Sequence, residues 1–444
     1  MNKDNSKKHV VVIGGGFTGL AAAYELERRG IRVTVFEGAK DVGGLASGFM
    51  VGNTPLERFY HHFFTIDSDL IGIIKELGIS DKIIKRSTST GMCFSNNLFR
   101  LSTPLDILHF KPLSVINRFR LGLLVLKARR YKNWQELDDL TAEEWIKSLC
   151  GDEVFRIVWG PLLAGKFGKY ASKVSAAWFW GKIVIRGGSR SKTGGEQLVY
   201  FKGGFSAIAD HIVRFITKSL STVCCNNPVD AIEVKNGKVT AVICKDKTVK
   251  CDAVIATPAL PVISNILCPH VDKQFVNELL RIKYLANVCL VLELDRSLSD
   301  MYWINVNDLS FPFVGVIEHT NFVPSSSYSG SNIVYLSKYL LRESEMYCFN
   351  DEALLKFALP HIQRMFPEFK ESWVKKYHVW RAEYAQPIVV KGFRHLVPKK
   401  ETPISGFYIS TMAQIYPEDR GVNYAIRDGR NIAKYVERSF DNEQ

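Results

Sequence analysis

The feature that most constrains the fold of this chain is a glycine-rich turn between a strand and a helix near its start. His9–Ile13 is an apolar run of strand length, and residues 14–19 then have the sequence GGGFTG. Residues 20–29 have the apolar periodicity of a helix, and residues 32–37 are the next strand-like run. The sequence therefore predicts a β-α-β unit, which is the opening of an α/β fold.

Each glycine of this turn has a physical reason to be there. Gly14 permits the tight turn, Gly16 lets the backbone approach a pyrophosphate, and Gly19 lets the helix pack closely on the strand. The amino terminus of the helix offers free N–H groups and the positive end of its dipole to phosphates. Glu37 ends the second strand, where its carboxylate can accept hydrogen bonds from ribose hydroxyls. The unit predicts a bound dinucleotide and leaves NAD and FAD both open.

Length and composition limit the remaining possibilities. The 444 residues exceed what one core usually supports, so two lobes are expected. Nine cysteines without a CxxC pair, and histidines without ligand spacing, predict neither a disulfide framework nor a structural metal. The first residues lack the apolar stretch of a signal peptide, and no window approaches roughly 18 consecutive apolar residues. We therefore expect a cytoplasmic protein that does not span a membrane.

The net charge of +13 indicates an anionic partner (nucleic acid, an acidic membrane face or a phosphorylated substrate) or a solubilising surface. Part of it lies in residues 112–132, where basic side chains surround the apolar run 121–126. The basic residues are Arg118, Arg120, Lys127, Arg129, Arg130 and Lys132. On a helical wheel these charges fall on more than one side. Two interpretations stay open for this segment: peripheral contact with an acidic membrane surface, and an ordinary solvated helix.

Between its ends the chain changes period several times. Residues 70–200 are predicted to be mostly helical, and residues 222–256 to form short strands, the last at 248–256. Asn236-Gly237 is typical of a hairpin turn. The other expected elements are strands at 288–294, 333–337 and 406–410, a loop at 411–420, and helices at 352–365 and 421–439.

Residues 10–49 resemble the amino-terminal signature of the flavin amine oxidase superfamily. This group includes monoamine oxidases, protoporphyrinogen oxidases and phytoene desaturases, with UDP-galactopyranose mutase as a more distant relative. Gly43-Gly44 resembles the second glycine pair of flavoproteins of the glutathione-reductase type, which favours FAD over NAD. Segments 202–208, 228–258 and 406–430 resemble later parts of the family pattern, in the family's order.

The resemblance implies a Rossmann-type FAD-binding domain, like that of glutathione reductase, with an inserted α+β substrate domain. The FAD domain is expected at 8–75, 200–275 and 396–444, and the substrate domain at 76–199 and 276–395. Val229 would bracket the adenine. The full set of implied cofactor-binding residues is Gly14, Gly15, Gly16, Phe17, Thr18, Gly19, Glu37, Gly43, Gly44, Leu45, Val229, Thr411, Met412 and Val422.

The chain also departs from the family pattern. Leu45 stands where Arg or Lys usually follows the second glycine pair. Thr411 and Met412 replace the usual Gly-Asp or Gly-Glu, whose carboxylate holds the ribityl chain. Asn287 is the nearest equivalent of the lysine that many amine oxidases place near flavin N5. The amine-oxidation chemistry of that lysine is therefore not carried over.

Two segments supply candidate catalytic residues. In the aromatic run 58–64, His62 best matches a histidine that passes the flavin face in relatives, where it could donate a hydrogen bond or accept a proton. The alternative is an aromatic core with satisfied imidazoles. In the loop before the closing helix, the candidates are Arg420, Asn423 and Tyr424, beside Glu418 and Asp419. The alternative there is Asp419 as helix N-cap and Arg420 in a surface ion pair.

These observations favour an FAD-dependent oxidoreductase that passes hydride from a small-molecule substrate to flavin N5, with no nucleic-acid partner. One alternative is a flavin-dependent sugar-nucleotide mutase resembling UDP-galactopyranose mutase. The other is a non-catalytic flavoprotein or membrane-bound binding module. Neither the substrate nor the oligomeric state follows from the sequence.

Overall fold

The computed structural model describes residues 8–189, 196–245 and 247–442. One end of the molecule is built on a parallel sheet of five strands in the order β10-β2-β1-β14-β20. The strands come from three separate stretches of the chain, because β1 and β2 precede the long insertions and β20 follows them. Their bounds are β1 His9–Ile13, β2 Arg32–Phe36, β10 Thr222–Cys224, β14 Ala253–Ala256 and β20 Phe407–Ile409.

The central strand β1 is apolar at successive positions because both faces of this sheet are covered. Val10, Val11 and Val12 are all fully buried. Helix α1 (Phe17–Arg28) packs on one face beside α9 (Gly204–Ile216) and α14 (Val422–Asn442). A Cβ atom at Gly429 of α14 would lie 2.2 Å from the main-chain oxygen of Thr18, so only glycine lets these two helices approach so closely. A three-stranded antiparallel sheet lies beside this domain core, formed by β11 Ala231–Lys235, β12 Lys238–Cys244 and β13 Lys247–Lys250.

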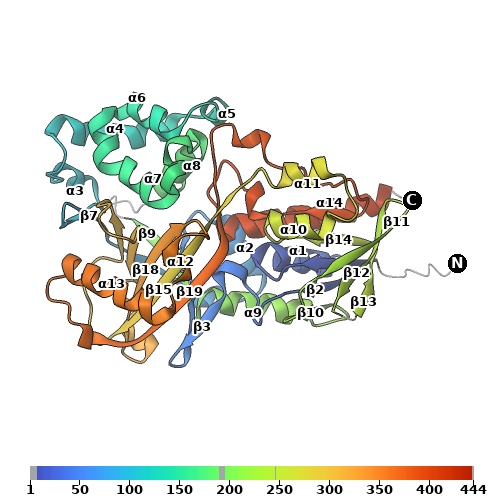
Figure 1. Ribbon diagram of the computed structural model, residues 1–444. Helices are drawn as coiled ribbons and strands as arrows, with labels where there is room; N and C mark the ends of the chain where they lie inside the picture. The colour runs from blue at the N-terminus through green and yellow to red at the C-terminus, as the bar shows by residue number, and fades with distance from the viewer. Residues whose placement is uncertain (1–7, 190–195, 246, 443–444) are drawn as a thin grey trace.

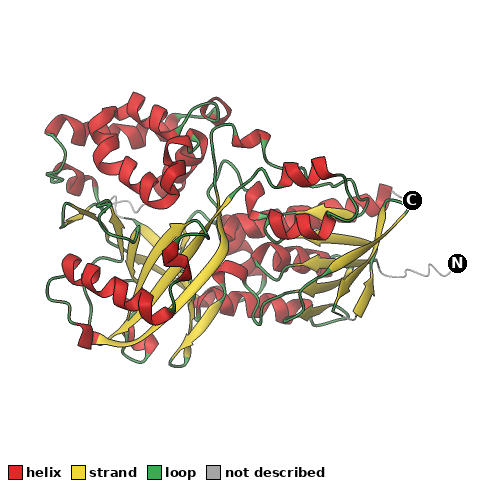
Figure 2. Ribbon diagram, viewed as in Figure 1, coloured by secondary structure: helices red, strands yellow, loops and turns green. Residues whose placement is uncertain are grey.

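The second large sheet has seven strands in the order β19-β15-β18-β17-β16-β7-β8. All neighbours are antiparallel except β16 and β7. Helix α13 (Asp351–Met365) lies against this sheet (Figure 2), and its buried apolar side chains belong to the core of the sheet. The strand bounds are β7 Thr90–Phe94, β8 Asn97–Arg100, β15 Tyr284–Leu294, β16 Trp303–Val306, β17 Gly315–Glu318, β18 Asn332–Leu340 and β19 Val374–Pro387.

A lobe of helices lies next to the seven-stranded sheet, at the end of the molecule away from both termini (Figure 1). Thr141 begins α6 with a capping box, in which its hydroxyl accepts from the Glu144 N–H and the Glu144 carboxylate accepts from the Thr141 N–H. The helices of this lobe are α3 Pro104–Leu108, α4 Val115–Arg130, α5 Trp134–Leu137, α6 Ala142–Val154, α7 Gly160–Phe167 and α8 Ala176–Gly188.

Smaller elements connect the two sheets. They are the hairpin β3 Gly48–Val51 and β4 Thr54–Glu57, and the sheet of β5 Phe63–Phe64, β9 Gln197–Phe201 and β6 Ile83–Ser87. The remaining helices are α2 Ser68–Glu76, α10 Leu260–Leu267, α11 Lys273–Leu279 and α12 Glu345–Cys348.

Several sequence expectations hold at the level of single elements. Strand β1 has the predicted bounds, and Asn236-Gly237 forms the predicted turn, with φ of 50° and 73°. The prediction that 70–200 is mostly helical is wrong in part, because β6 to β9 lie in it. The hairpin of β7 and β8, which this prediction missed, has its turn at Ser95 and Asn96. Both residues have positive φ. The predicted single strand 248–256 is two strands in different sheets.

The predicted domain boundaries are not tested by this arrangement and stay a prediction.

Candidate functional site

The glycine turn after β1 has the geometry that its sequence predicts. Gly14 has φ of +100°, and a Cβ there would lie 2.5 Å from Thr257 Oγ1. A Cβ at Gly19 would lie 1.9 Å from the main-chain oxygen of Gly14, so helix and strand can meet only at glycine. Beside Gly16 the nearest atom to such a Cβ is the Gly44 Cα, at 3.9 Å. This position is open, as a close backbone approach by a ligand requires.

The second glycine pair lies directly against the first. The Gly43 N–H donates to the Gly15 main-chain oxygen at 2.8 Å, and Gly43 forms an isolated parallel bridge with Gly16. Gly43 and Gly44 have φ of +105° and +58°, which favours glycine at both positions. Leu45 follows, half-buried in a 3-10 turn. The structure thus brings both glycine motifs together at the carboxyl end of β1.

Two neighbours of the turn complete its packing. Phe17 begins α1 and is buried edge-on against Phe205, with 6.1 Å between the ring centroids. Thr18 is half-buried beneath Gly429 of α14. Both residues hold the position of the helix whose amino terminus faces the glycine turn.

Glu37 lies beside this cradle. Its Oε2 accepts from the Gly15 N–H at 2.6 Å, and its Oε1 accepts from the Ala39 N–H at 2.7 Å. A carboxylate has about four lone-pair positions, so it can still accept from ribose hydroxyls. The main chain of Glu37 accepts from the Asn227 N–H at 2.9 Å, which holds the segment before the half-buried Val229 nearby. The predicted adenosine end of the site is therefore assembled from distant parts of the chain.

The segment after β20 uses its side chains partly for its own turn. Thr411 is buried, its Oγ1 accepts from the Ala413 N–H at 3.2 Å, and its own N–H donates to Gln414 Oε1 at 2.8 Å. Met412 is half-buried in the same turn, and Val422 begins α14. The predicted cofactor contacts of these three residues stay a prediction.

The loop before α14 is anchored to the helical lobe through Asp419. Its Oδ1 accepts from the Trp178 indole N–H at 3.0 Å, and its Oδ2 accepts from Lys182 Nζ at 2.7 Å. Lys166 Nζ lies 3.6 Å from the same Oδ2. The side chains of Lys166 and Asp419 are only 15% and 18% exposed, so this is an interior ion cluster. Asp419, Lys166, Lys182 and Trp178, with the adjacent Arg420, are called the Asp419 cluster below.

Arg420 connects the same loop to the seven-stranded sheet. Its Nη2 donates to the Tyr339 hydroxyl at 2.7 Å, and its Nε donates to Gln386 Oε1 at 3.1 Å. Tyr339 belongs to β18 and the buried Gln386 to β19, within the segment Tyr384-Pro387. The closing loop therefore joins the helical lobe to the seven-stranded sheet, and the Asp419 cluster lies at this junction.

The charges of the Asp419 cluster do not balance within it. Lys166 and Lys182 contact the one carboxylate, and the positive charge of Arg420 acts on it from the next residue. Burial alone would raise the pKa of Asp419, but the two ammonium groups hold it well below its usual range. Burial lowers the pKa of Lys166 well below its ordinary value, against the opposing effect of Asp419. The Lys166 amine also lies 4.7 Å from the Trp178 ring centroid and 5.4 Å from that of Tyr339.

The other candidates of this loop have different partners. Asn423 Oδ1 accepts from the N–H groups of Asp69 and Leu70 at 2.9 and 3.0 Å, which satisfies the first turn of α2. Glu418 pairs with Arg427 at 2.8 Å, and the Arg427 guanidinium lies 4.9 Å from the centroid of the Tyr424 ring. Of the three predicted catalytic residues here, only Arg420 joins the Asp419 cluster. Arg420 donates to Tyr339 and Gln386 and is not in a surface ion pair. The Asp419 carboxylate binds Trp178 and Lys182 of the helical lobe, so it is not only a helix N-cap.

The two adjacent histidines face different surroundings. His62 Nδ1 lies 3.0 Å from the Tyr302 hydroxyl, and its ring meets those of Phe64 and Trp303 edge-on. Burial, assisted by the positive charge of Arg420 and opposed by the hydrogen bond to the Phe59 main-chain oxygen, lowers the pKa of His61 to about 4. His61 is therefore within electrostatic reach of the Asp419 cluster. The proposed role of His62 stays a prediction.

The family of this chain follows from its similarity to known proteins. Residues 17–436, nearly the whole chain, match the family described as flavin containing amine oxidoreductase. The chain belongs to this family. Its membership confirms the predicted superfamily and the FAD cofactor, and it places the chain in the class of flavin-dependent oxidoreductases.

Individual relatives agree with this family. Coproporphyrinogen III oxidase of Bacillus subtilis (strain 168) is 27% identical over 184 residues, which are 38% of this chain and 39% of that protein. An oxidoreductase from Methanosarcina mazei has a TM-score of 0.74 at 19% identity, covering 96% and 100% of the two chains. Reduced UDP-galactopyranose mutase has a TM-score of 0.74 at 15% identity, covering 97% and 94%.

The chain spans about two fifths or less of the curated relatives it matches. The likeness to solved structures confirms the predicted fold class, a Rossmann-type domain with a second, mixed domain, and establishes the fold alone.

The residues of the cradle fit FAD. The open position beside Gly16 admits a pyrophosphate, and Glu37 keeps lone pairs for a ribose. Among the described residues, Arg58 Nε and Ser206 Oγ are buried without a hydrogen-bond partner. Both residues lie close to the start of β3, which follows the second glycine pair. The Arg58 N–H donates to the Ser47 main-chain oxygen at 3.0 Å, and a Cβ at Gly48 would meet Ser206 Oγ. Orphaned polar atoms at this place are consistent with a ligand that supplies their partners.

Sequence reasoning missed Lys166, Trp178 and Lys182. They lie on α7 and α8, far along the chain from every cofactor motif. One signal was present: Lys166 is the single charged residue in the run GPLLAGKFG, residues 160–168, which is otherwise apolar or glycine. A lone lysine in such a run has to be solvated, paired or functional.

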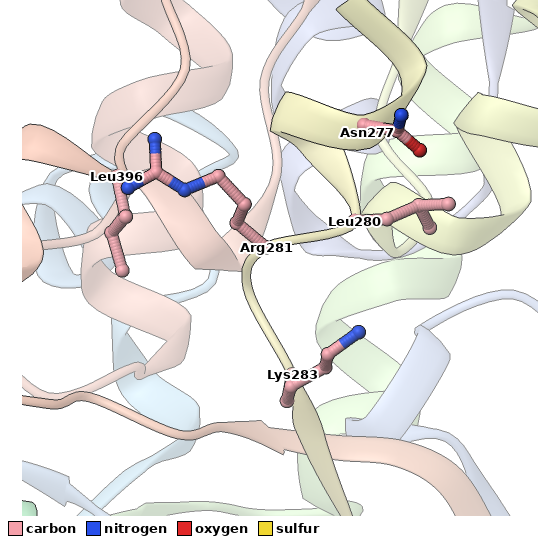
Figure 3. A pocket seen from close by; sticks show the side chains of 5 residues that line it. All are labelled: Asn277, Leu280, Arg281, Lys283 and Leu396. Atoms are coloured by element: carbon pink, nitrogen blue, oxygen red, sulfur yellow. The ribbon is translucent and has the colours of Figure 1, made fainter. Parts of the chain in front are cut away.

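Two other features of the surface lie apart from this site. An open pocket of about 610 Å³ lies beside α11, and Figure 3 shows Arg281 extending toward Leu396 there. It contains no predicted site residue; the side chains that line it are Asn277, Leu280, Arg281, Lys283 and Leu396. Asp138, Asp139 and His395 lie close enough to share a metal ion, but Arg394 already pairs with both carboxylates. The prediction that the protein holds no metal is not tested by this geometry. No helix among the described residues is long and apolar enough to cross a bilayer.

Proposed function

We propose that this protein is an FAD-dependent oxidoreductase whose small organic substrate carries an anionic group. The observation that carries this proposal is the Asp419 cluster, at the junction of the closing loop, the helical lobe and the seven-stranded sheet. Two lysines contact its one carboxylate, and the adjacent Arg420 adds a third basic side chain. An excess of buried positive charge is costly unless an anion compensates it. A carboxylate or phosphate on the substrate would supply that compensation.

The cofactor would be held by the two glycine motifs, by Glu37 on the ribose and by the amino terminus of α1 on the pyrophosphate. Bound FAD supplies the acceptor for a substrate hydride. The protein contributes position, charge and proton transfer. Val229 would lie at the adenine and Thr411, Met412 and Val422 at the flavin end.

The basic residues of the Asp419 cluster would have two different roles, anion binding and proton transfer. Lys182 and Arg420 are fixed by hydrogen bonds to Asp419, Tyr339 and Gln386, so they can orient an anionic group without reorganising. Burial lowers the pKa of Lys166, and its Nζ lies farther from Asp419 Oδ2 than the Nζ of Lys182 does, which eases the loss of the Lys166 proton. It would accept the proton that the substrate releases as its hydride leaves.

The test is anaerobic mixing of FAD-loaded protein with pools of candidate substrates, followed by flavin bleaching. The pools comprise polyprenoids, porphyrinogens, amines and sugar nucleotides, and each acidic compound is paired with its neutral ester or amide. We expect bleaching by an acidic compound and not by its neutral partner. Lys166→Met should lower the bleaching rate by roughly 10²–10⁴-fold, as for a lost acid–base group.

Lys169→Met is the matched control, because Lys169 is exposed three residues further along the chain. It should bleach at the wild-type rate. Equal bleaching by acidic and neutral partners, or an unchanged rate in Lys166→Met, would remove the assigned role of the cluster.

The same experiment separates the alternatives. A sugar-nucleotide mutase would interconvert sugar ring forms with its flavin kept reduced and would show no net substrate oxidation. A non-catalytic flavoprotein would hold a flavin that neither a substrate nor a chemical reductant reduces. Structural likeness to UDP-galactopyranose mutase does not choose between these outcomes, because at this identity it reports only the fold.

A further inference from the structure

The helical lobe carries an unusual amount of exposed apolar surface on α3 and α4. Among the described residues, fifteen large apolar side chains are exposed, and seven of them lie within residues 105–126. The other eight are scattered over the rest of the molecule. The seven are Leu105, Leu108, Val115, Ile116, Phe119, Leu123 and Leu126, each between 41% and 68% exposed. We call them the α3–α4 face. Such a concentration of exposed apolar side chains in one part of the fold is typical of an interaction surface.

Helix α4 is apolar on two opposite sides, which explains the imperfect amphipathic pattern of residues 112–132. Leu121, Leu124 and Ala128 are buried where α4 packs on α6 and α8. Ile116, Phe119, Leu123 and Leu126 follow one another at spacings of three and four residues and form an exposed stripe. Such a spacing aligns side chains on one helix face. A solvated helix would carry charged residues along this stripe, so the solvated interpretation does not account for it.

The segment of chain that carries this stripe has charges of one sign, with Asp106 and Glu136 at its borders. Residues 107–135 contain seven Lys and Arg residues and no Asp or Glu. Four of the seven, Lys127, Arg129, Arg130 and Lys132, are exposed at or just after the carboxyl end of α4. The end of the stripe is therefore surrounded by cations that can reach an anionic surface while the apolar side chains leave water.

We propose that the α3–α4 face binds an anionic membrane, with its apolar stripe in the interfacial layer and its cations at the lipid phosphates. A helix with an apolar face and Lys and Arg beside it binds lipid in this orientation. A second copy of the chain is a poor occupant, because two such faces would bring like charges together. The proposal does not depend on the proposed function, since it concerns a different surface and needs no substrate.

The experiment is vesicle flotation with the full-length, FAD-loaded protein. The vesicles contain phosphatidylcholine alone or phosphatidylcholine mixed with phosphatidylglycerol. We expect wild type to float with the mixed vesicles and to stay largely free with phosphatidylcholine. The double variant Phe119→Asp/Leu123→Asp should bind mixed vesicles at least about ten-fold more weakly, because its apolar stripe no longer gains by leaving water.

The matched control introduces two aspartates at exposed apolar positions outside the α3–α4 face. Leu220 and Leu309 are 66% and 65% exposed outside the α3–α4 face, so Leu220→Asp/Leu309→Asp should bind like wild type. A second variant, Lys127→Gln/Arg130→Gln, should lose affinity for the mixed vesicles while keeping the apolar stripe. Flavin absorbance and circular dichroism on each preparation establish that the variants are folded.

Each remaining outcome overturns the proposal. Wild type that floats with neither vesicle has no membrane face here. Binding that survives Phe119→Asp/Leu123→Asp and disappears in salt is charge adsorption without insertion. Equal loss in the Leu220→Asp/Leu309→Asp control is a general effect of added negative charge. A lipid-free dimer that only Phe119→Asp/Leu123→Asp dissociates would assign the face to a second copy of the chain.

Discussion

Glu57 offers a quantitative test of the interior of this protein, because it is a buried carboxyl with neutral partners. It ends β4 and is 1% exposed. Its Oε2 accepts from the Tyr200 hydroxyl and its Oε1 from the Phe205 N–H, both at 2.7 Å. Burial raises the pKa of Glu57 from 4.5 to about 7, although both hydrogen bonds act in the opposite direction. The folded protein therefore holds this proton more tightly than the unfolded chain does.

The sign of the linkage follows from that difference. Because the folded pKa lies above the unfolded one, the contribution of Glu57 to stability is complete below about pH 4.5. It is lost as the pH rises through about 7. Between about pH 5 and about pH 8 the loss amounts to roughly 2–3 kcal/mol, since one pKa unit corresponds to about 1.4 kcal/mol.

Glu57→Gln isolates this contribution. The amide oxygen can accept from the Phe205 N–H and the amide nitrogen can donate to the Tyr200 hydroxyl, but the side chain does not titrate. The measurement is urea unfolding at saturating FAD, for wild type and Glu57→Gln, at the two pH values. The free energy of unfolding of wild type minus that of Glu57→Gln should fall by about 2–3 kcal/mol from the lower to the higher pH. Every other titrating group cancels in this difference.

Glu278→Gln, which removes an exposed carboxylate of α11, is the control for the loss of a carboxylate at the surface. A wild-type minus Glu57→Gln difference that is equal at both pH values would refute the reasoning. Glu57 would then keep one charge state across the range, and the buried network would be described wrongly.

Two further predictions concern the cofactor and the candidate histidine. Glu37→Ala should weaken FAD binding by about 10- to 150-fold in a titration of the apoprotein, because one charge-assisted hydrogen bond is worth roughly 1.5–3 kcal/mol; an unchanged affinity would contradict its role. His62→Ala should keep FAD and lower turnover by roughly 10²–10⁴-fold, the effect of a lost acid or base. A lower melting temperature with a near-normal rate per bound flavin would instead favour packing of His62 against Tyr302.

The sequence predicted those parts of the fold whose conformation depends on residues close together in the chain. The glycine turn after β1 needs residues without a Cβ, and its clash distances show why no other residue fits at Gly19. The turn at Asn236-Gly237 needs positive φ at both positions, which these residues tolerate. Such requirements act within a few residues, so a sequence displays them directly.

The parts that escaped prediction depend on contacts between distant segments. Lys166 and Asp419 are separated by more than half of the chain, and only the packing of α7 and α8 on the closing loop brings them together. Asn423 is a similar case, since its partners lie in the first turn of α2. A polar residue in a flavin-facing loop fits catalysis and capping equally well until its partner is known.

The helical lobe connects the two anion-binding surfaces proposed for this protein. Helix α8 holds Asp419 through Trp178 and Lys182, and its Trp180 indole donates to the Ala128 main-chain oxygen of α4 at 2.8 Å. The Asp419 cluster and the α3–α4 face are therefore separated by a single packed helix pair. A substrate with an anionic head and an apolar body could use both surfaces, reaching the cluster from the membrane.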